Sequence, residues 1–337
     1  MSDLLRAENL SAGYVTAAGL VQAVDDVTLS LREGEVLGIA GESGCGKSTL
    51  AALLARNIQL PLRVTGGTLS MDGELADLSR ALPRPQRGTL LSVLPQGAMN
   101  AINPTTRVRD LAYDVLRAHE SGVTRKSARE RAAERLGELG LPPRAVDQYP
   151  HELSGGMRQR VVAVISTLLN PRILIADEPS SALDVSSQQA LVALLRDLLS
   201  REIIRGVVFI THDLPLMRSV ADRVAIMYAG RLAELGQTDQ MLNEPRHPYT
   251  RALVGSVLVP EPYVRRHRIE GIPGSPPDLA NPPVGCRFHP RCPLADDKCL
   301  TDPPRVGDLE SFAYCWRVAE AAQGQPVAPT AVAGSGA

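Results

Sequence analysis

The residues that most constrain the fold are Gly41-Glu-Ser-Gly-Cys-Gly-Lys-Ser48, which match the phosphate-binding pattern G-x-x-x-x-G-K-[ST]. The pattern is informative when it joins a strand to a helix, and here the apolar run Val36–Ala40 precedes it and the helix-like residues 49–54 follow it. Glycines let backbone N–H groups turn toward phosphate oxygens, and the next helix N-terminus adds its positive dipole end. The segment therefore predicts a nucleotide site in an α/β fold.

Two further groups of residues complete the predicted site. In the loop, Lys47 supplies positive charge for catalysis and Ser48 a hydroxyl for Mg²⁺. A second apolar run, 173–176, ends in Asp177, which we expect in the Mg²⁺ shell, and Glu178, the candidate general base for an attacking water. We expect ATP and Mg²⁺ to be bound by Asp177 together with the loop residues Gly41, Glu42, Ser43, Gly44, Cys45, Gly46, Lys47, Ser48 and Thr49.

A phosphate loop alone fits kinases, GTPases, helicases and transport ATPases, and three later motifs narrow the choice. Leu153-Ser-Gly-Gly-Met157 opens a helical stretch about 20 residues before the carboxylate strand, and Ser181-Ala-Leu-Asp184 and Thr211-His-Asp213 follow that strand. In this order the motifs resemble those of ATP-binding cassette (ABC) ATPases. The resemblance implies an α/β fold with a P-loop ABC ATPase core, a RecA-like mixed sheet and an inserted helical subdomain.

The segment Leu153–Met157, called the signature below, is a second helix N-terminus suited to phosphate. It cannot fold back onto Lys47 of its own chain. In the family, ATP is held between the phosphate loop of one cassette and the signature of another. The resemblance therefore implies that Ser154, Gly155 and Gly156 act in trans and that Asp184 bridges the two cassettes.

Three more roles follow from the resemblance. Gln96 is expected to contact Mg²⁺ or the attacking water and to sense a membrane partner. His212 is expected to hold the γ-phosphate. Tyr14 lies where the family has an aromatic residue that stacks on adenine, and a packed tyrosine at a strand end remains the alternative.

Proline content marks the main boundary in the chain, since 15 of the 26 prolines lie at or after residue 245. Such density opposes long helices and central strands. We expect a nucleotide-binding domain at 1–245 with a helical subdomain at about 97–166, an extension at 246–320 and a disordered tail at 321–337. The core strands are expected to be apolar runs buried on both faces: Val36–Ala40, 90–94, 173–176, 207–210 and 224–227.

The extension contains His247-Pro-Tyr249 and four cysteines, and it resembles the C-terminal region of dipeptide and oligopeptide importer ATPases. The thiols Cys286, Cys292, Cys299 and Cys315 lack the short C-x₂₋₄-C spacing favoured by structural zinc. The resemblance favours a [4Fe–4S] cluster with a structural role, while Zn²⁺ or free thiols remain open. Cys45 stands apart and is expected to be a small packed residue.

The resemblance implies an ATPase subunit that energises peptide import with a second cassette, expected to be a different chain, two membrane permeases and an extracytoplasmic binding protein. Oligosaccharides, nickel or other small solutes remain alternative cargoes. A soluble ABC ATPase acting on nucleic acid or ribosomes is more remote, because 36 Lys and Arg against 37 Asp and Glu leave no general basic footprint. Without an export signal or a bilayer-length apolar run, we expect the chain at the cytoplasmic face of the plasma (inner) membrane.

Overall fold

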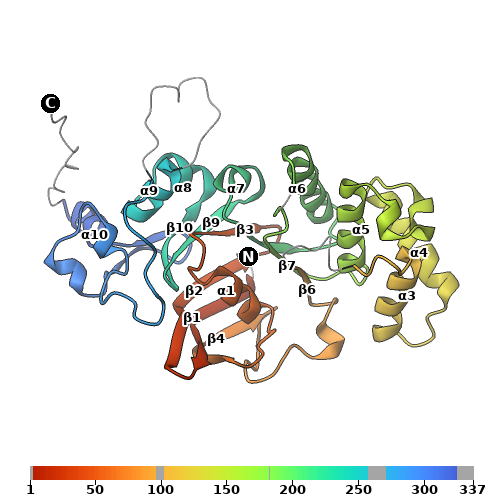
Figure 1. Ribbon diagram of the computed structural model, residues 1–337, viewed down its shortest axis with the longest axis horizontal. Coiled ribbons are helices and arrows are strands. Elements are labelled where there is room, and N and C mark those ends of the chain that lie inside the picture. The colour runs from red at the N-terminus through yellow and green to blue at the C-terminus, as the bar shows by residue number, and fades with distance from the viewer. Residues whose placement is uncertain (1–2, 96–101, 182, 257–270, 325–337) are drawn as a thin grey trace.

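The computed structural model describes residues 3–95, 102–181, 183–256 and 271–324. The molecule is elongated, with a group of helices at one end and the C-terminal segment at the other (Figure 1). Between them lies an eight-stranded mixed sheet in the order β11-β12-β10-β9-β3-β8-β7-β6. In the part of the chain that the structure describes, no helix is both long and apolar enough to cross a membrane.

Five adjacent strands of this sheet are the apolar runs of the sequence. They are β3 (Val36–Ala40), β6 (Leu91–Leu94), β7 (Ile173–Asp177), β8 (Gly206–Ile210) and β9 (Arg223–Tyr228). The five pair in parallel, which confirms an α/β core. The expectation of burial on both faces is wrong for β6, which forms one edge of the sheet and in which Val93 is 38% exposed.

A second sheet, in the order β2-β1-β4-β5, packs against the first through helix α1 (Lys47–Leu54). It consists of β1 (Asp3–Thr16), β2 (Gly19–Arg32), β4 (Leu62–Met71) and β5 (Glu74–Leu75), all antiparallel. Helix α1 contacts β2 on one side and β7 and β8 on the other. This packing fixes the N-terminus of α1 at the carboxyl end of β3.

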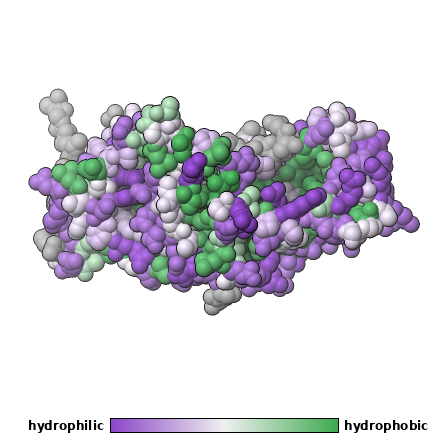
Figure 2. Space-filling model, turned by 90° about the horizontal axis from the view of Figure 1, so that it is seen from below, coloured by the Kyte–Doolittle hydropathy of each residue, from purple (hydrophilic) through white to green (hydrophobic). Residues whose placement is uncertain are grey.

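The predicted helical subdomain is present as α3 (Val108–His119), α4 (Arg125–Glu138) and α5 (Gly155–Thr167). Helix α4 buries Ala128, Ala132 and Leu136, which are spaced by one helical turn, and its charged residues lie on other faces. The end of the molecule formed by these helices is largely hydrophilic in Figure 2.

The remaining helices cover the sheet and the extension. They are α6 (Val185–Ser200), α7 (Leu214–Val220), α8 (Thr238–Asn243), α9 (Pro248–Gly255) and α10 (Trp316–Ala322). Single 3₁₀ turns are η1 (Arg84–Gln86), η2 (Pro143–Asp147), η3 (Pro150–Glu152), η5 (His289–Arg291) and η6 (Asp297–Leu300). Helix α10 includes Ala321 and Ala322, so the expectation that a disordered tail begins at residue 321 is wrong.

The C-terminal extension is built into the core sheet. Strand β12 (Phe312–Tyr314) pairs with β10 (Arg231–Gln237), and β11 (Arg305–Gly307) pairs with β12. The domain limits taken from the sequence stay predictions, because this pairing makes one sheet from residues on both sides of position 245.

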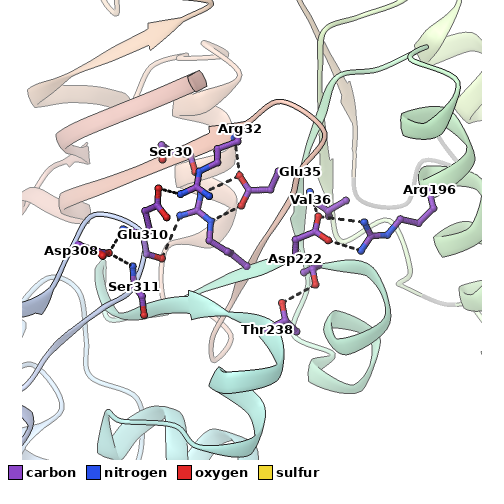
Figure 3. A network of polar contacts seen from close by, with 12 residues as sticks. Ser30, Arg32, Glu35, Val36, Arg196, Asp222, Thr238, Asp308, Glu310 and Ser311 are labelled. Atoms are coloured by element: carbon purple, nitrogen blue, oxygen red, sulfur yellow. Dashed lines mark hydrogen bonds and ion pairs between the residues drawn. The ribbon is translucent and has the colours of Figure 1, made fainter. Parts of the chain in front are cut away.

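A buried ion pair reinforces this junction (Figure 3). Arg223, only 1% exposed, donates from Nε to Oε1 of Glu35 at 2.5 Å and from Nη2 to the carbonyl of Ser30 at 2.8 Å. The same network reaches Glu310, which precedes β12 and forms an ion pair with Arg32. Through Glu310 the network therefore connects the extension with Arg32 of β2 and Arg223 of β9.

Candidate nucleotide site

The phosphate loop leaves the end of β3 and enters α1 with two glycines in backbone conformations that other residues rarely adopt. Gly41 has φ 154° and Gly46, at the N-cap, has φ 106°. A Cβ at either position would lie 2.1 Å from a backbone oxygen, that of Met227 or of Ala23 respectively. Both glycines are therefore required by close backbone packing as well as by the turn.

Lys47 lies inside the curl of the loop. Its side chain is buried, and Nζ donates to the carbonyl oxygens of Gly41 at 2.8 Å and Glu42 at 2.9 Å. The ammonium is thus held where the loop and the N-terminus of α1 meet, which is the position predicted for a phosphate-binding lysine. Cys45 is buried beside it, and burial raises the pKa of its thiol, in agreement with a packed and unreactive cysteine.

The residues predicted to hold Mg²⁺ meet at the carboxyl end of β7. The Ser48 hydroxyl donates to Oδ1 of Asp177 at 3.4 Å, although 129 residues separate the two. Burial raises the pKa of Asp177, and the hydrogen bond from Ser48 opposes that shift. A hydroxyl and a carboxylate are oxygen ligands of the kind that Mg²⁺ prefers, so this pair fits the ion. The third predicted ligand, Gln96, lies outside the described residues.

Glu178, the residue after Asp177, lies beside His212. Its φ of 46° lies in the left-handed region, and its N–H donates to the carbonyl of Ile210 at 2.9 Å. Its Oε1 lies 3.4 Å from Nδ1 of His212. An unfavourable backbone conformation is retained where the surroundings enforce it. The two carboxylates that follow each other in sequence thus contact different side chains, Ser48 and His212 respectively.

Tyr14 lies on β1 beside the first turn of α1. Its hydroxyl is 3.0 Å from Oγ1 of Thr49, and either oxygen can be the donor. This contact connects the four-stranded sheet to the phosphate loop. The predicted stacking of Tyr14 on adenine is not tested by this geometry and stays a prediction.

The signature residues lie at the N-terminus of α5, in the helical end of the molecule and away from α1 (Figure 1). Ser154 is the N-cap and accepts from the Met157 N–H at 3.4 Å, with Gly155 the first residue of the helix. A Cβ at Gly156 would meet nothing within 4 Å. The fold of this chain therefore gives no steric reason for glycine at 156.

Asp184 caps α6. Its Oδ1 accepts from the Ser187 N–H at 2.7 Å and from the Ser186 hydroxyl at 2.8 Å, and these hydrogen bonds lower the pKa of the carboxyl. The cap accounts for an aspartate at this position within one chain. Its predicted bridging role between cassettes stays a prediction.

Two residues that sequence reasoning missed, Arg291 and Tyr249, contact the phosphate loop at Glu42. Arg291 donates to both carboxylate oxygens of Glu42, at 2.7 and 3.0 Å, and to the Tyr228 hydroxyl at 3.2 Å. The hydroxyl of Tyr249 accepts from the Glu42 N–H at 2.9 Å. The only sequence signal was the motif at 247–249, in which His247 caps α9 through Nδ1 and so directs Tyr249 inward.

The four C-terminal thiols lie within electrostatic range of one another. Burial raises the pKa of Cys286 to about 12 and that of Cys292 to about 11, and neighbouring thiols add to both shifts. Burial likewise raises the pKa values of Cys299 and Cys315. Among the described residues, however, no three His, Cys, Asp or Glu side chains are placed to hold a metal ion. Neither the predicted cluster nor the zinc alternative is supported by this arrangement.

Comparison with known families gives two matches. Residues 24–181 match the family described as ABC transporter. Residues 233–299 match the family described as oligopeptide/dipeptide transporter, C-terminal region. Together they span the phosphate loop, the signature, the carboxylate strand and three of the four C-terminal cysteines.

Similar proteins include a dipeptide transport ATP-binding protein, DppD, of Caldanaerobacter subterraneus, 38% identical over 93% of this chain and 96% of the relative. The oligopeptide transport ATP-binding protein OppD of Bacillus subtilis is 40% identical over 88% of this chain and 83% of the relative. OppF of Escherichia coli is 38% identical over 88% of each chain.

Solved structures of similar fold include a dimeric structure of MJ0796, described as a bacterial ABC transporter cassette, with a TM-score of 0.58 and 25% identity. That match covers 69% of this chain and 98% of the other. CbiO1 of Clostridium perfringens matches with a TM-score of 0.60 and 22% identity, over 72% of this chain and 92% of the other.

Proposed function

The chain belongs to the ABC transporter ATPases of the dipeptide and oligopeptide importer family, and from this premise we propose that it energises import of dipeptides or oligopeptides by hydrolysing ATP. The observation that carries the proposal is the meeting of three separate sequence segments at one end of the parallel sheet. Lys47 and Ser48 follow β3, Asp177 ends β7 with Glu178 directly after it, and His212 follows β8.

We propose a role for each of these side chains. The loop N–H groups and Lys47 bind the β- and γ-phosphates, and Ser48 with Asp177 holds Mg²⁺, which neutralises phosphate charge when bound. Glu178 accepts the proton of the attacking water, and His212, 3.4 Å from that carboxylate, binds the γ-phosphate and helps to orient it. Because the two carboxylates have different neighbours, Asp177 can bind Mg²⁺ while Glu178 accepts the proton of the water.

We propose that the site is completed by a second cassette. The α5 N-terminus lies away from α1 in its own chain. The space beside the Cα atom of Gly156 is open, since a Cβ there would meet nothing within 4 Å. A phosphate from a facing cassette fits such a helix terminus. In this arrangement Ser154, Gly155 and Gly156 act in trans and Asp184 lies at the junction. The second cassette is a different chain, and both bind two permeases at the cytoplasmic membrane face, which receive peptide from an extracytoplasmic binding protein.

A site built from two chains cannot be complete in one, so the isolated protein is expected to hydrolyse ATP slowly. Addition of its partner cassette and permeases in lipid nanodiscs is expected to raise phosphate release by at least about tenfold. The Gly156→Arg variant tests the in-trans role directly. It should bind ATP as the parent does, because the space at Gly156 is open within the chain, yet lower turnover in the assembly. Full activity from a demonstrated monomer would contradict the in-trans assignment.

The cargo is tested by uptake. Cells lacking the transporter genes should regain accumulation of labelled di- or oligopeptides when the parent system is restored, and an inactive Glu178 variant should not restore it. Accumulation of oligosaccharide or nickel with no peptide uptake would select the alternative cargoes instead. Specific ATPase stimulation by nucleic acid would favour the more remote alternative.

We also propose that Cys286, Cys292, Cys299 and Cys315 hold a [4Fe–4S] cluster. The described side chains as placed form no metal site, so the support is the composition alone: four thiols, two buried and two half-buried, lie within electrostatic range of one another, and four is the number of thiolates that such a cluster uses. Zinc at about 2.3 Å from each sulfur would require the thiols to converge on one point, whereas a cluster binds each thiolate to a different iron. A structural role fits a proline-rich segment with a small core.

Anaerobically purified protein is then expected to be brown, with about four irons and four acid-labile sulfides per chain. Serine at any one of the four positions should lower iron content, since each substitution removes a ligand. Cys45→Ser should leave it unchanged, because Cys45 lies in the phosphate loop. Colourless protein with stoichiometric zinc, or with neither metal, would refute the cluster and leave the ATPase assignment intact.

A further inference from the structure

We propose that Arg291 and Tyr249 of the C-terminal extension are positioning residues for ATP binding, acting on the phosphate loop through Glu42. Glu42 occupies the second position of the loop, where the phosphate-binding pattern leaves the side chain unspecified. Three groups nevertheless hold it: Tyr249 at its N–H, Lys47 at its carbonyl and Arg291 at its carboxylate. Two of the three come from beyond residue 245.

Arg291 and Glu42 form a bidentate ion pair. Arg291 is 9% exposed and uses both terminal nitrogens in a forked pair with the carboxylate. Its Nε donates to the carbonyl of Pro273 at 2.7 Å, and Nη1 also donates to the Tyr228 hydroxyl. The guanidinium is therefore held by the extension at Pro273 and by the core at Glu42 and Tyr228.

The consequence for nucleotide binding follows from the shared residue. Lys47 donates to the Glu42 carbonyl, so the backbone that Arg291 and Tyr249 hold also sets where the phosphate-binding ammonium lies. If the extension fixes the loop in the conformation that binds phosphate, ATP must in return stabilise the extension by the same coupling free energy. This coupling requires neither a particular cargo nor a group bound to the thiols.

The test uses the full-length chain and Mg²⁺ with a fluorescent ATP analogue, titrated to give a dissociation constant. Arg291→Gln and Glu42→Gln are each expected to weaken binding about tenfold, and the double variant about as much as either single one, because both changes break the same interaction. Arg291→Lys should give an intermediate loss, since lysine keeps the charge without the fork. Tyr249→Phe should weaken binding severalfold by removing the acceptor for the Glu42 N–H.

The control variant is Asp302→Asn, which breaks a 2.6 Å ion pair to Arg231 that joins the extension to β10 without touching the loop. It should bind ATP as the parent does. A second measurement is amide hydrogen exchange at residues 286–292, which ATP should slow in the parent and not in Arg291→Gln. If Arg291→Gln does not fold, Glu42→Gln tests the same contact from the core side. Parent-like affinity in the Glu42 and Arg291 variants, additive losses, or an equal loss in Asp302→Asn would overturn the proposal.

Discussion

Replacing Glu178 with glutamine is expected to stop ATP turnover while ATP binding stays close to that of the parent chain. The amide keeps the shape of the side chain, and the backbone hydrogen bond from residue 178 to Ile210 does not involve the carboxylate. An amide does not accept the proton of the attacking water, and a positioned general base contributes about 10²- to 10⁴-fold. Phosphate release by the assembled transporter should therefore fall by about two orders of magnitude or more.

Binding and turnover must be measured on the same preparation to interpret this variant. The exposed residue Glu244 at the end of α8 provides the matched control, since Glu244→Gln makes the same chemical change away from the site. Turnover at the parental rate in Glu178→Gln would show that another group removes the proton.

Replacing Lys47 with alanine is expected to weaken ATP binding by about 100-fold or more. The ammonium is buried inside the loop, and its removal takes away the positive charge that faces the phosphates and leaves the carbonyls of Gly41 and Glu42 without their donor. Titration with Mg²⁺ and ATP measures the loss directly. The two variants thus separate binding from chemistry, because one should lose affinity and the other turnover.

The control for this change is Lys126→Ala, at an exposed lysine near the start of α4. Its affinity for ATP should equal that of the parent. The assignment of the phosphate-binding lysine would be wrong if Lys47→Ala bound ATP within about twofold of the parent while remaining folded.

The parallel strands could be predicted because each is a short apolar run, and most of them end in a motif residue or lie just before one. The first two strands could not be predicted in the same way. Strands β1 and β2 are 14 residues each, and their pairing contains several register shifts. Asn9 and Asp26 lie within them at positive φ, and such polar residues indicate turns when read from sequence alone. Bulges of this kind interrupt the alternation by which a long strand is recognised.

The site shows the same division between local and long-range information. Lys47, Ser48, Asp177, Glu178 and His212 lie in short motifs whose spacing is readable, and the structure brings them together. The contact of Arg291 with Glu42 joins residues 249 positions apart, and no local pattern indicates it. Only the folding of the extension onto the core places this arginine beside the loop.

The pairing of β12 with β10 also determines which backbone groups the large sheet presents to other molecules. Strand β10 is seven residues long, and without the extension its outer N–H and C=O groups would be available to pair with a strand of another chain. With the extension in place, the outermost strands of the sheet are β11, with three residues, and β6, with four. Strands this short are poor templates for intermolecular pairing, so the extension protects the ATPase core from aggregation through its sheet.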